Sequence, residues 1–254
     1  MTEAVVEPTM VDESLLVVET AHLITEDDEP VDNLFSEKQQ RLLTEPLYTS
    51  WKGPGDDRPF LATANVGLFI VNRNPAIVPD VLLSLDVVMP EDWWTTEGRS
   101  YTIWELGKTP DLVVEIVSNQ KGDELGDKFR KYEQMRVPIY VVLDPEKQIQ
   151  DELLAVYALN GFGYHKLTSS EAYRFPEIGL GLTLWEGDFE RRSAKWLRWT
   201  DLTGNLIPTG DEQRVRAEQE AARAEQEKAR AEQEKARADR LAAMLRAAGI
   251  EPDA

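Results

Sequence analysis

The chain has 254 residues, 42% of them hydrophobic, which is enough for one sizeable domain with extensions, and its formal net charge is −19 at pH 7. It contains no cysteine, which excludes disulfides and thiolate metal sites and fits a reducing, cytoplasmic location. No apolar run approaches the ~18 residues of a membrane helix, so we expect no membrane span and no membrane partner.

The N-terminal part is strongly acidic. Residues 1–37 hold eleven Asp or Glu and no Lys or Arg. We predict a mostly extended acidic leader over residues 1–35. A capping-box pattern that begins at Ser36 then predicts the start of a helix. Leu42 and Leu43 give this helix an apolar face, and Pro46 should kink or end it.

The middle of the chain alternates strand and helix signals. Apolar segments predict four strands, at residues 60–71, 77–85, 100–106 and 111–118. Leu125, Phe129 and Tyr132 recur at helical spacing and predict a helix. Further strands are expected at residues 139–143, in a hairpin around Asn160-Gly161, and at residues 180–185 as the last strand. This order is typical of an α/β or α+β core.

The tail differs in kind from the rest of the chain. Four consecutive seven-residue units at residues 217–244 consist mainly of strong helix formers. We predict a helix over residues 211–248, capped by Gly249 and stopped by Pro252. The seven-residue period is that of a coiled coil, but no Leu or Ile lines a seam before Leu241. A free-standing charged helix and a weak oligomerising coil therefore both stay open.

Two carboxylates stand in apolar, strand-forming segments. Glu115 lies in the middle of LVVEIV, where a buried strand should not hold a carboxylate without a partner or a metal. Asp80 lies at the mouth of the apolar segment VPDVLL. Magnesium prefers carboxylate and carbonyl oxygens, which Asp80, Glu115 and the backbone of Ile116 could supply. Lys128, on the following helix, could orient a water or hold a phosphate, so the pattern predicts a metal-dependent hydrolytic site.

Each of these residues also has a purely structural interpretation. Asp80 and Asp111 follow prolines at strand starts, where acidic residues often serve turns. Glu115 could face solvent if its strand were covered on one face only, although its neighbours are apolar on both sides. Lys128 by itself could be an ordinary surface lysine.

The runs PDLVVEIVS, GDELGDKFRKYEQM and VPIYVVLDP, with IVPDVLL upstream, resemble the Uma-two restriction endonuclease family. The core of that family resembles the PD-(D/E)XK nuclease superfamily. The resemblance implies a restriction-endonuclease-like mixed sheet flanked by helices and a site that depends on Mg²⁺ or Mn²⁺. It implies that Asp80 and Glu115 bind the metal and that Lys128 completes the catalytic set. The superfamily pattern expects a lysine two residues after the second acid, where this chain has Val117, so the lysine of this family would stand at Lys128.

We therefore expect three parts: the acidic leader at residues 1–35, a restriction-endonuclease-like domain at residues 36–205, and a linker with a charged helix at residues 206–254. The predicted function is a metal-dependent endonuclease that acts on DNA as a homodimer. Dimer contacts are expected around the aromatic pair Trp93-Trp94 or the segment Trp196–Trp199.

The alternative is a catalytically weak or inactive nuclease-fold protein that interacts with partners through its C-terminal helix. The acidity of the chain and Val117 favour this alternative, because nucleic-acid binders usually carry a basic footprint. The presence of Asp80, Glu115 and Lys128 together favours the nuclease.

Overall fold

The computed structural model describes residues 33–51, 53–55, 57–70, 76–95, 98–118, 124–168 and 172–248. The predicted leader up to residue 32 and the predicted helix stop at Gly249 and Pro252 lie outside these ranges. The chain divides into two compact units, Met1–Ile207 and Pro208–Ala254, which are described separately below.

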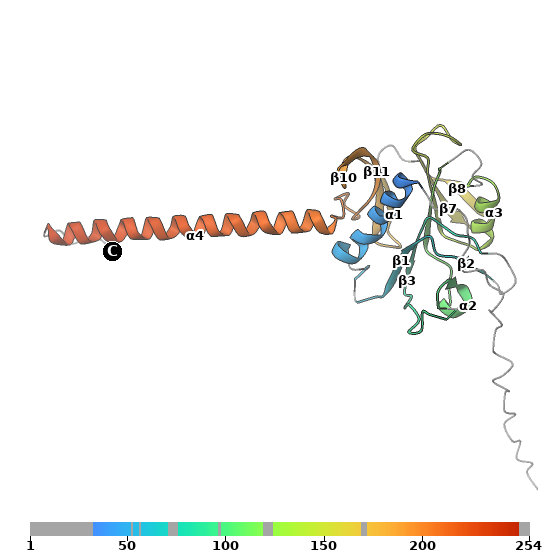
Figure 1. The fold of residues 1–254 in the computed structure, drawn as a ribbon, viewed down its shortest axis with the longest axis horizontal. Coiled ribbons are helices and arrows are strands. Elements are labelled where there is room, and N and C mark those ends of the chain that lie inside the picture. Colours follow the sequence, from blue (N-terminus) through green and yellow to red (C-terminus); the bar gives the residue numbers. More distant parts are fainter. Residues whose placement is uncertain are drawn as a thin grey trace, which may run out of the picture. The chain divides into compact units, whose positions relative to one another are not determined.

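A six-stranded mixed sheet forms the centre of the described part of the first unit, in the order β1-β3-β5-β6-β7-β8 (Figure 1). Its strands are β1 (Phe60–Ala64), β3 (Val81–Leu85), β5 (Leu112–Ile116), β6 (Ile139–Leu143), β7 (Leu154–Asn160) and β8 (Gly163–Lys166). β5 and β6 are parallel, and the other neighbours are antiparallel. Every residue of β3, β5 and β6 is buried, which explains their continuous apolar sequences.

Two smaller sheets and short helices complete the unit. A three-stranded antiparallel sheet contains β9 (Ala172–Phe175), β10 (Leu180–Phe189) and β11 (Arg192–Thr200). A parallel pair joins β2 (Leu68–Phe69) to β4 (Tyr101–Thr102). The helices are α1 (Leu34–Pro46), which continues into the π-helical turn η2 (Leu47–Trp51), α2 (Ile103–Leu106) and α3 (Asp127–Gln134).

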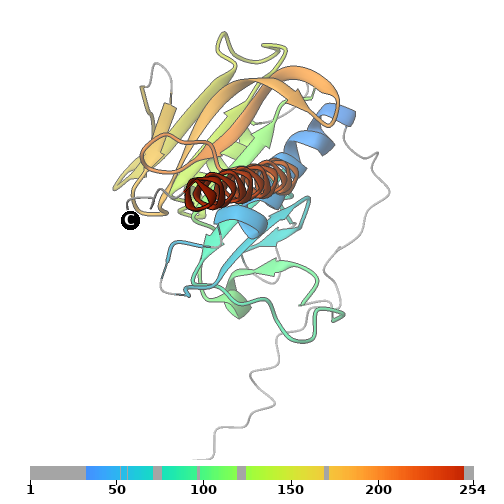
Figure 2. The same cartoon turned by 90° about the vertical axis from the view of Figure 1, so that its left-hand side faces the viewer.

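The described side chains form two apolar clusters, one on each face of the central sheet. Figure 2 shows the ribbon of this unit from a second direction. On one face Leu83 and Val114 pack with Leu43 of α1 and Leu197 of β11. On the other face, which we call the α3 face, the cluster contains Leu82, Val113, Tyr132, Tyr140 and Val142. Because successive side chains of a strand point to opposite faces, Glu115 shares the α3 face with Val113.

Helix α1 is held on β11 by polar contacts as well as apolar ones. The Gln39 amide pairs with both backbone groups of Leu197, donating to its carbonyl at 2.8 Å and accepting from its N–H at 2.9 Å. The Trp199 indole donates to the carbonyl of Leu43 at 2.7 Å. Both tryptophans of the segment Trp196–Trp199 are buried. The prediction that this segment offers exposed aromatic side chains to a second chain is therefore wrong, because they cover α1 within one chain.

Two predicted element boundaries were also wrong, and one strand of the three-stranded sheet was not predicted. Helix α1 begins two residues before Ser36, because the Asn33 side chain accepts hydrogen bonds from two of the first helical amides. Only the start of the predicted strand at residues 100–106 is extended, and the rest forms α2, which ends at Gly107 with φ +78°. The predicted last strand at residues 180–185 is followed by β11, which the sequence analysis missed.

The turn before β11 explains why that strand was missed. Glu190 and Arg191 connect β10 to β11 as a two-residue loop, since Phe189 pairs with Arg192. Both loop residues have positive φ values, 46° and 65°, a conformation usually signalled by Asn or Gly. The Glu190 carboxylate forms ion pairs with Lys38 and Arg41 of α1. Contacts with a distant helix thus hold a turn whose own residues do not favour its conformation.

The second unit contains α4 (Gly210–Ala247), a continuous helix of 38 residues. Thr209 and Glu212 form a reciprocal capping box at its start. None of its residues is buried, and pairs such as Arg214–Glu218 support it locally. In the part of the chain that is described, no helix combines the length and apolarity that crossing a bilayer requires.

Candidate active site

The candidate site lies where the start of β3 meets the end of β5. Val81 pairs with Val114 and Leu82 with Val113, so continuing this register by one residue places Asp80 opposite Glu115. The Asp80 Oδ2 atom accepts a hydrogen bond of 2.6 Å from the backbone N–H of Ile116. Its Oδ1 atom accepts one of 3.1 Å from the Gln40 amide of α1. The Asp80 side chain therefore bonds to the backbone of β5 one residue before β3 begins.

Glu115 is fully buried, and α3 supplies two donors to its carboxylate. The Tyr132 hydroxyl donates to Oε1 at 2.6 Å, and the Lys128 ammonium donates to Oε2 at 2.8 Å. Lys128 and Tyr132 are four residues apart, so they project from the same face of α3. The Tyr132 ring is buried against Tyr140 of β6, with ring centroids 5.1 Å apart, and this packing fixes α3 over the sheet.

The electrostatics of this group favour a cation. Burial raises the pKa of Glu115 to about 8, and the negative charge of Asp80 adds to the shift, while Lys128 opposes it. Burial disfavours the charged form of Lys128, but the charges of Glu115, Asp80 and Glu124 outweigh this effect and raise the pKa of Lys128. The carboxyl groups of Asp80, Glu115 and Glu124 thus outnumber the single ammonium group of Lys128.

Glu124 is a site candidate that the sequence analysis did not single out. It is 7% exposed, and its Oε2 atom is buried with no hydrogen-bond partner among the described residues. Its backbone carbonyl accepts a bond of 2.7 Å from the Tyr140 hydroxyl, which anchors the residue next to the α3 face. The polar run GDELGD resembles a solvated loop, so the only signal in the sequence is its position four residues before Lys128.

The oxygen donors present fit a hard cation such as Mg²⁺ or Mn²⁺. The two carboxylate oxygens of Glu115 accept the hydrogen bonds from Lys128 and Tyr132, and a carboxylate oxygen has two lone pairs. Over the described ranges, no three or more His, Cys, Asp and Glu side chains form a group that could hold a metal. The described residues would thus supply only part of a coordination shell, as is common for Mg²⁺ bound through one or two carboxylates together with water and substrate phosphate.

Two neighbouring positions have structural roles. Val117 is 2% exposed and belongs to the apolar cluster of the α3 face, so the ammonium group beside Glu115 comes from α3 instead. Asp111 accepts hydrogen bonds from the backbone N–H of Leu85 at 2.7 Å and from the Lys108 ammonium at 2.6 Å. Asp111 thus ties β5 to the end of β3, in agreement with its structural interpretation.

Comparison with known proteins places these residues in a family. A family model described as Uma2, putative restriction endonuclease, matches residues 28–184. No curated protein matches the chain. The matched range includes the whole central sheet together with Asp80, Glu115, Glu124 and Lys128.

Proposed function

Because this chain belongs to the Uma2 restriction endonuclease family, we propose that it is a metal-dependent endonuclease that hydrolyses phosphodiester bonds in DNA. The observation that carries this proposal is the contact of Lys128 with the buried Glu115 beside Asp80. The mixed α/β fold with its restriction-endonuclease-like sheet supports it.

Asp80 and Glu115 would hold the Mg²⁺ or Mn²⁺ ion through carboxylate oxygens, and the Ile116 carbonyl is a further candidate ligand. When bound, the ion supplies a Lewis acid for the phosphate and lowers the pKa of a water molecule. Tyr132 keeps the Glu115 carboxylate in one orientation through its hydrogen bond to Oε1. The Gln40 amide and the Ile116 N–H orient Asp80 in the same way.

Lys128 would act on the phosphate or on the attacking water. Its ammonium group has three N–H donors, and the hydrogen bond to Glu115 uses one of them. Its side chain is 33% exposed, whereas that of Glu115 is completely buried, so a substrate can approach the lysine from solvent. Because the pKa of Lys128 is raised, the group is charged at neutral pH and acts as a donor, stabilising negative charge in the transition state.

A second candidate function is that of a nuclease-fold protein that binds partners through α4. The observation that favours it is the length of α4, 38 residues without a buried side chain. The net charge of −19 also weakens DNA binding, and a metal ion would offset part of this effect near the phosphate.

A cleavage assay on plasmid and linear DNA with Mg²⁺, Mn²⁺ or EDTA separates the two functions. We expect cleavage only with metal, and a loss of about 10²-fold or more in Glu115→Gln and Asp80→Asn, because both remove a metal ligand. Asp127→Asn is the matched control, since Asp127 is an exposed acid on the same helix as Lys128. Cleavage that survives EDTA or Glu115→Gln would contradict the proposed site. A folded wild-type protein that cuts no DNA with either metal would favour the second function.

A further inference from the structure

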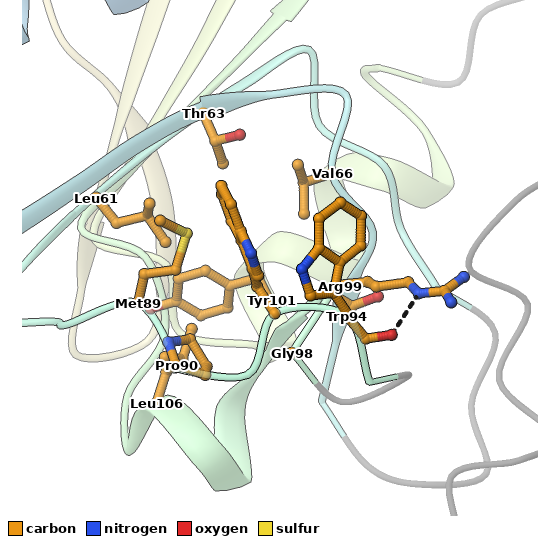
Figure 3. A pocket seen from close by; sticks show the side chains of 12 residues that line it. Leu61, Thr63, Val66, Met89, Pro90, Trp94, Gly98, Arg99, Tyr101 and Leu106 are labelled. Atoms are coloured by element: carbon orange, nitrogen blue, oxygen red, sulfur yellow. Dashed lines mark hydrogen bonds between the residues drawn. The ribbon is translucent and has the colours of Figure 1, made fainter.

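A cavity of about 520 Å³ lies between β1 and the segment that leads to β4. Most of the side chains that line it are apolar or aromatic, among them Leu61, Met89, Trp93, Trp94, Tyr101 and Leu106. Figure 3 shows the Trp94 indole beside Val66, and the Tyr101 ring beside Met89. Its volume and its apolar lining with a few polar groups are those of small-molecule sites.

The aromatic rings of this cavity are both held and accessible. Tyr101 is 1% exposed, and its hydroxyl donates to the Lys108 carbonyl at 3.1 Å and is bonded to the Ser84 hydroxyl at 2.8 Å. Trp93 and Trp94 are 50% and 76% exposed, with their rings in an edge-to-face arrangement 5.8 Å apart. The cavity thus combines a fixed phenol ring with two indoles that solvent or a ligand can reach.

The cavity and the candidate site share one face of the central sheet. Thr63 of β1 lines the cavity and pairs with Leu82 of β3, which in turn pairs with Val113 of β5. Side chains at alternate positions share a face, so Thr63, Val113 and Glu115 all belong to the α3 face. Strand spacings of ~4.8 Å and a rise of ~3.3 Å per residue put Thr63 roughly 12 Å from Glu115. A few nucleotides of one DNA strand span that length.

We propose that this cavity binds an unpaired nucleobase of the DNA strand whose phosphate lies at Asp80 and Glu115. The inference rests on the proposed endonuclease function and narrows its substrate to DNA with an unpaired base. Every base has a flat π-face that stacks on aromatic side chains. A paired base cannot enter a recess of this kind, so the base must come from a single strand or leave the helix.

The polar groups of the cavity fit a nucleotide. Thr63 and Ser100 contribute hydroxyl groups to the lining, which can bond to the edge of a base. Arg99 is the only charged side chain among the described residues that line it. Its Nε atom donates to the Trp94 carbonyl at 3.2 Å, and in Figure 3 its guanidinium extends away from Met89 and Tyr101. The base would lie among the rings, with its phosphate near this guanidinium.

A binding experiment without metal tests the cavity separately from catalysis. Two oligonucleotide duplexes carry one 2-aminopurine, paired in the first and bulged in the second, and binding is measured in EDTA. We expect the bulged duplex to bind about 10-fold more tightly and its fluorescence to fall as the base stacks. Trp94→Ala should remove this preference, while Trp94→Phe should retain most of it. Phe162→Ala is the control, an exposed aromatic on the β7–β8 turn.

The outcomes distinguish this inference from the endonuclease proposal. Equal binding of the two duplexes, or an unchanged preference in Trp94→Ala, would overturn the nucleobase site. It would also be overturned if Trp94→Ala changed only self-association in sedimentation, because the indoles would then pair two copies of the chain. A preference for the bulged duplex without cleavage in Mg²⁺ or Mn²⁺ would support the cavity and contradict the endonuclease. Cleavage without a preference for the bulged duplex would support the endonuclease and contradict the nucleobase site.

Discussion

Glu115 is held in a folded environment that favours its protonated form. Burial raises its pKa to about 8, so the folded protein binds the proton more strongly than the unfolded chain does. The stability that this group contributes is complete below its unfolded pKa of ~4.3 and is lost as the pH rises through 8. A metal ion that binds the carboxylate would offset this loss, since it stabilises the ionised form.

The direction of the Glu115 pKa shift gives a test that does not require enzyme activity. The melting temperature of the metal-free protein should fall as the pH rises from 6 to 9, and the fall should be smaller in Glu115→Gln, which cannot ionise. Thermal denaturation followed by circular dichroism measures both slopes. Glu146→Gln, a change of an exposed acid, should keep the wild-type slope. Parallel slopes for wild type and Glu115→Gln would show that Glu115 is already ionised at pH 6.

Lys128 should matter for catalysis more than for folding. Lys128→Ala is expected to lower DNA cleavage about 10²- to 10³-fold, because it removes the donor to the phosphate or water. The fold should persist at neutral pH, since loss of the ammonium raises the pKa of Glu115 further and the acid takes up a proton. Lys131→Ala, at an exposed position on the same helix, should cleave like the wild type. Undiminished cleavage by Lys128→Ala would remove this lysine from the site.

At the scale of elements, α1 depends on β11. The Gln39 amide satisfies both backbone groups of Leu197 in a buried position. Gln39→Leu should therefore destabilise the protein by about 2–4 kcal/mol, since an unsatisfied buried backbone group costs ~1–3 kcal/mol. Urea unfolding measures the change. Gln39→Glu can keep both hydrogen bonds only as the neutral acid, so it should be less stable at pH 8 than at pH 5. A loss that is equal in both variants and independent of pH would point to packing as the cause.

The elements that could be predicted from the sequence are those whose pattern depends on burial alone. β3, β5 and β6 are buried on both faces, so their apolar runs identified them. β11 was missed because its turn contains Glu190-Arg191, whose backbone conformation is held by contacts with α1. A turn that depends on residues about 150 positions away in the chain leaves no local signal.

The sequence likewise predicts only part of the candidate site. A carboxylate inside an apolar strand is visible in the sequence, and the structure brings Glu115 and Lys128 into contact. Glu124 could not be identified, because a polar run gives no sign that one of its carboxylates is buried. The cavity at Trp93-Trp94 could not be foreseen either, since it forms only when β1 and the segment before β4 come together.

At the scale of the whole molecule, we propose that residues 36–205 fold as the catalytic domain. Both apolar clusters lie within Met1–Ile207, and α4 has no buried residue. Deleting residues 208–254 should therefore leave the cooperative melting transition of the remaining chain within a few degrees of the wild type. Calorimetry measures this, and loss of the transition would show that the core needs α4.

The same deletion tests the proposed homodimer. The exposed apolar side chains near the end of α4 are Leu241, Met244 and Leu245, so any seam between two tails would be short. If the chains pair through the first unit, sedimentation should show dimers with and without the tail. A dimer that becomes a monomer on deletion would instead assign the pairing to α4.

The contacts between α1 and β11 also set an order of events during synthesis. Gln39 and Leu43 bind residues 158 and 156 positions later in the chain. A nascent chain would therefore present the apolar face of α1 without its cover until about residue 200 has left the ribosome. Contacts of such long range slow folding, because a large loop must close before they form. Helix α1 would thus be synthesised early but be among the last elements to dock, and the incomplete chain would depend on chaperones to avoid aggregation.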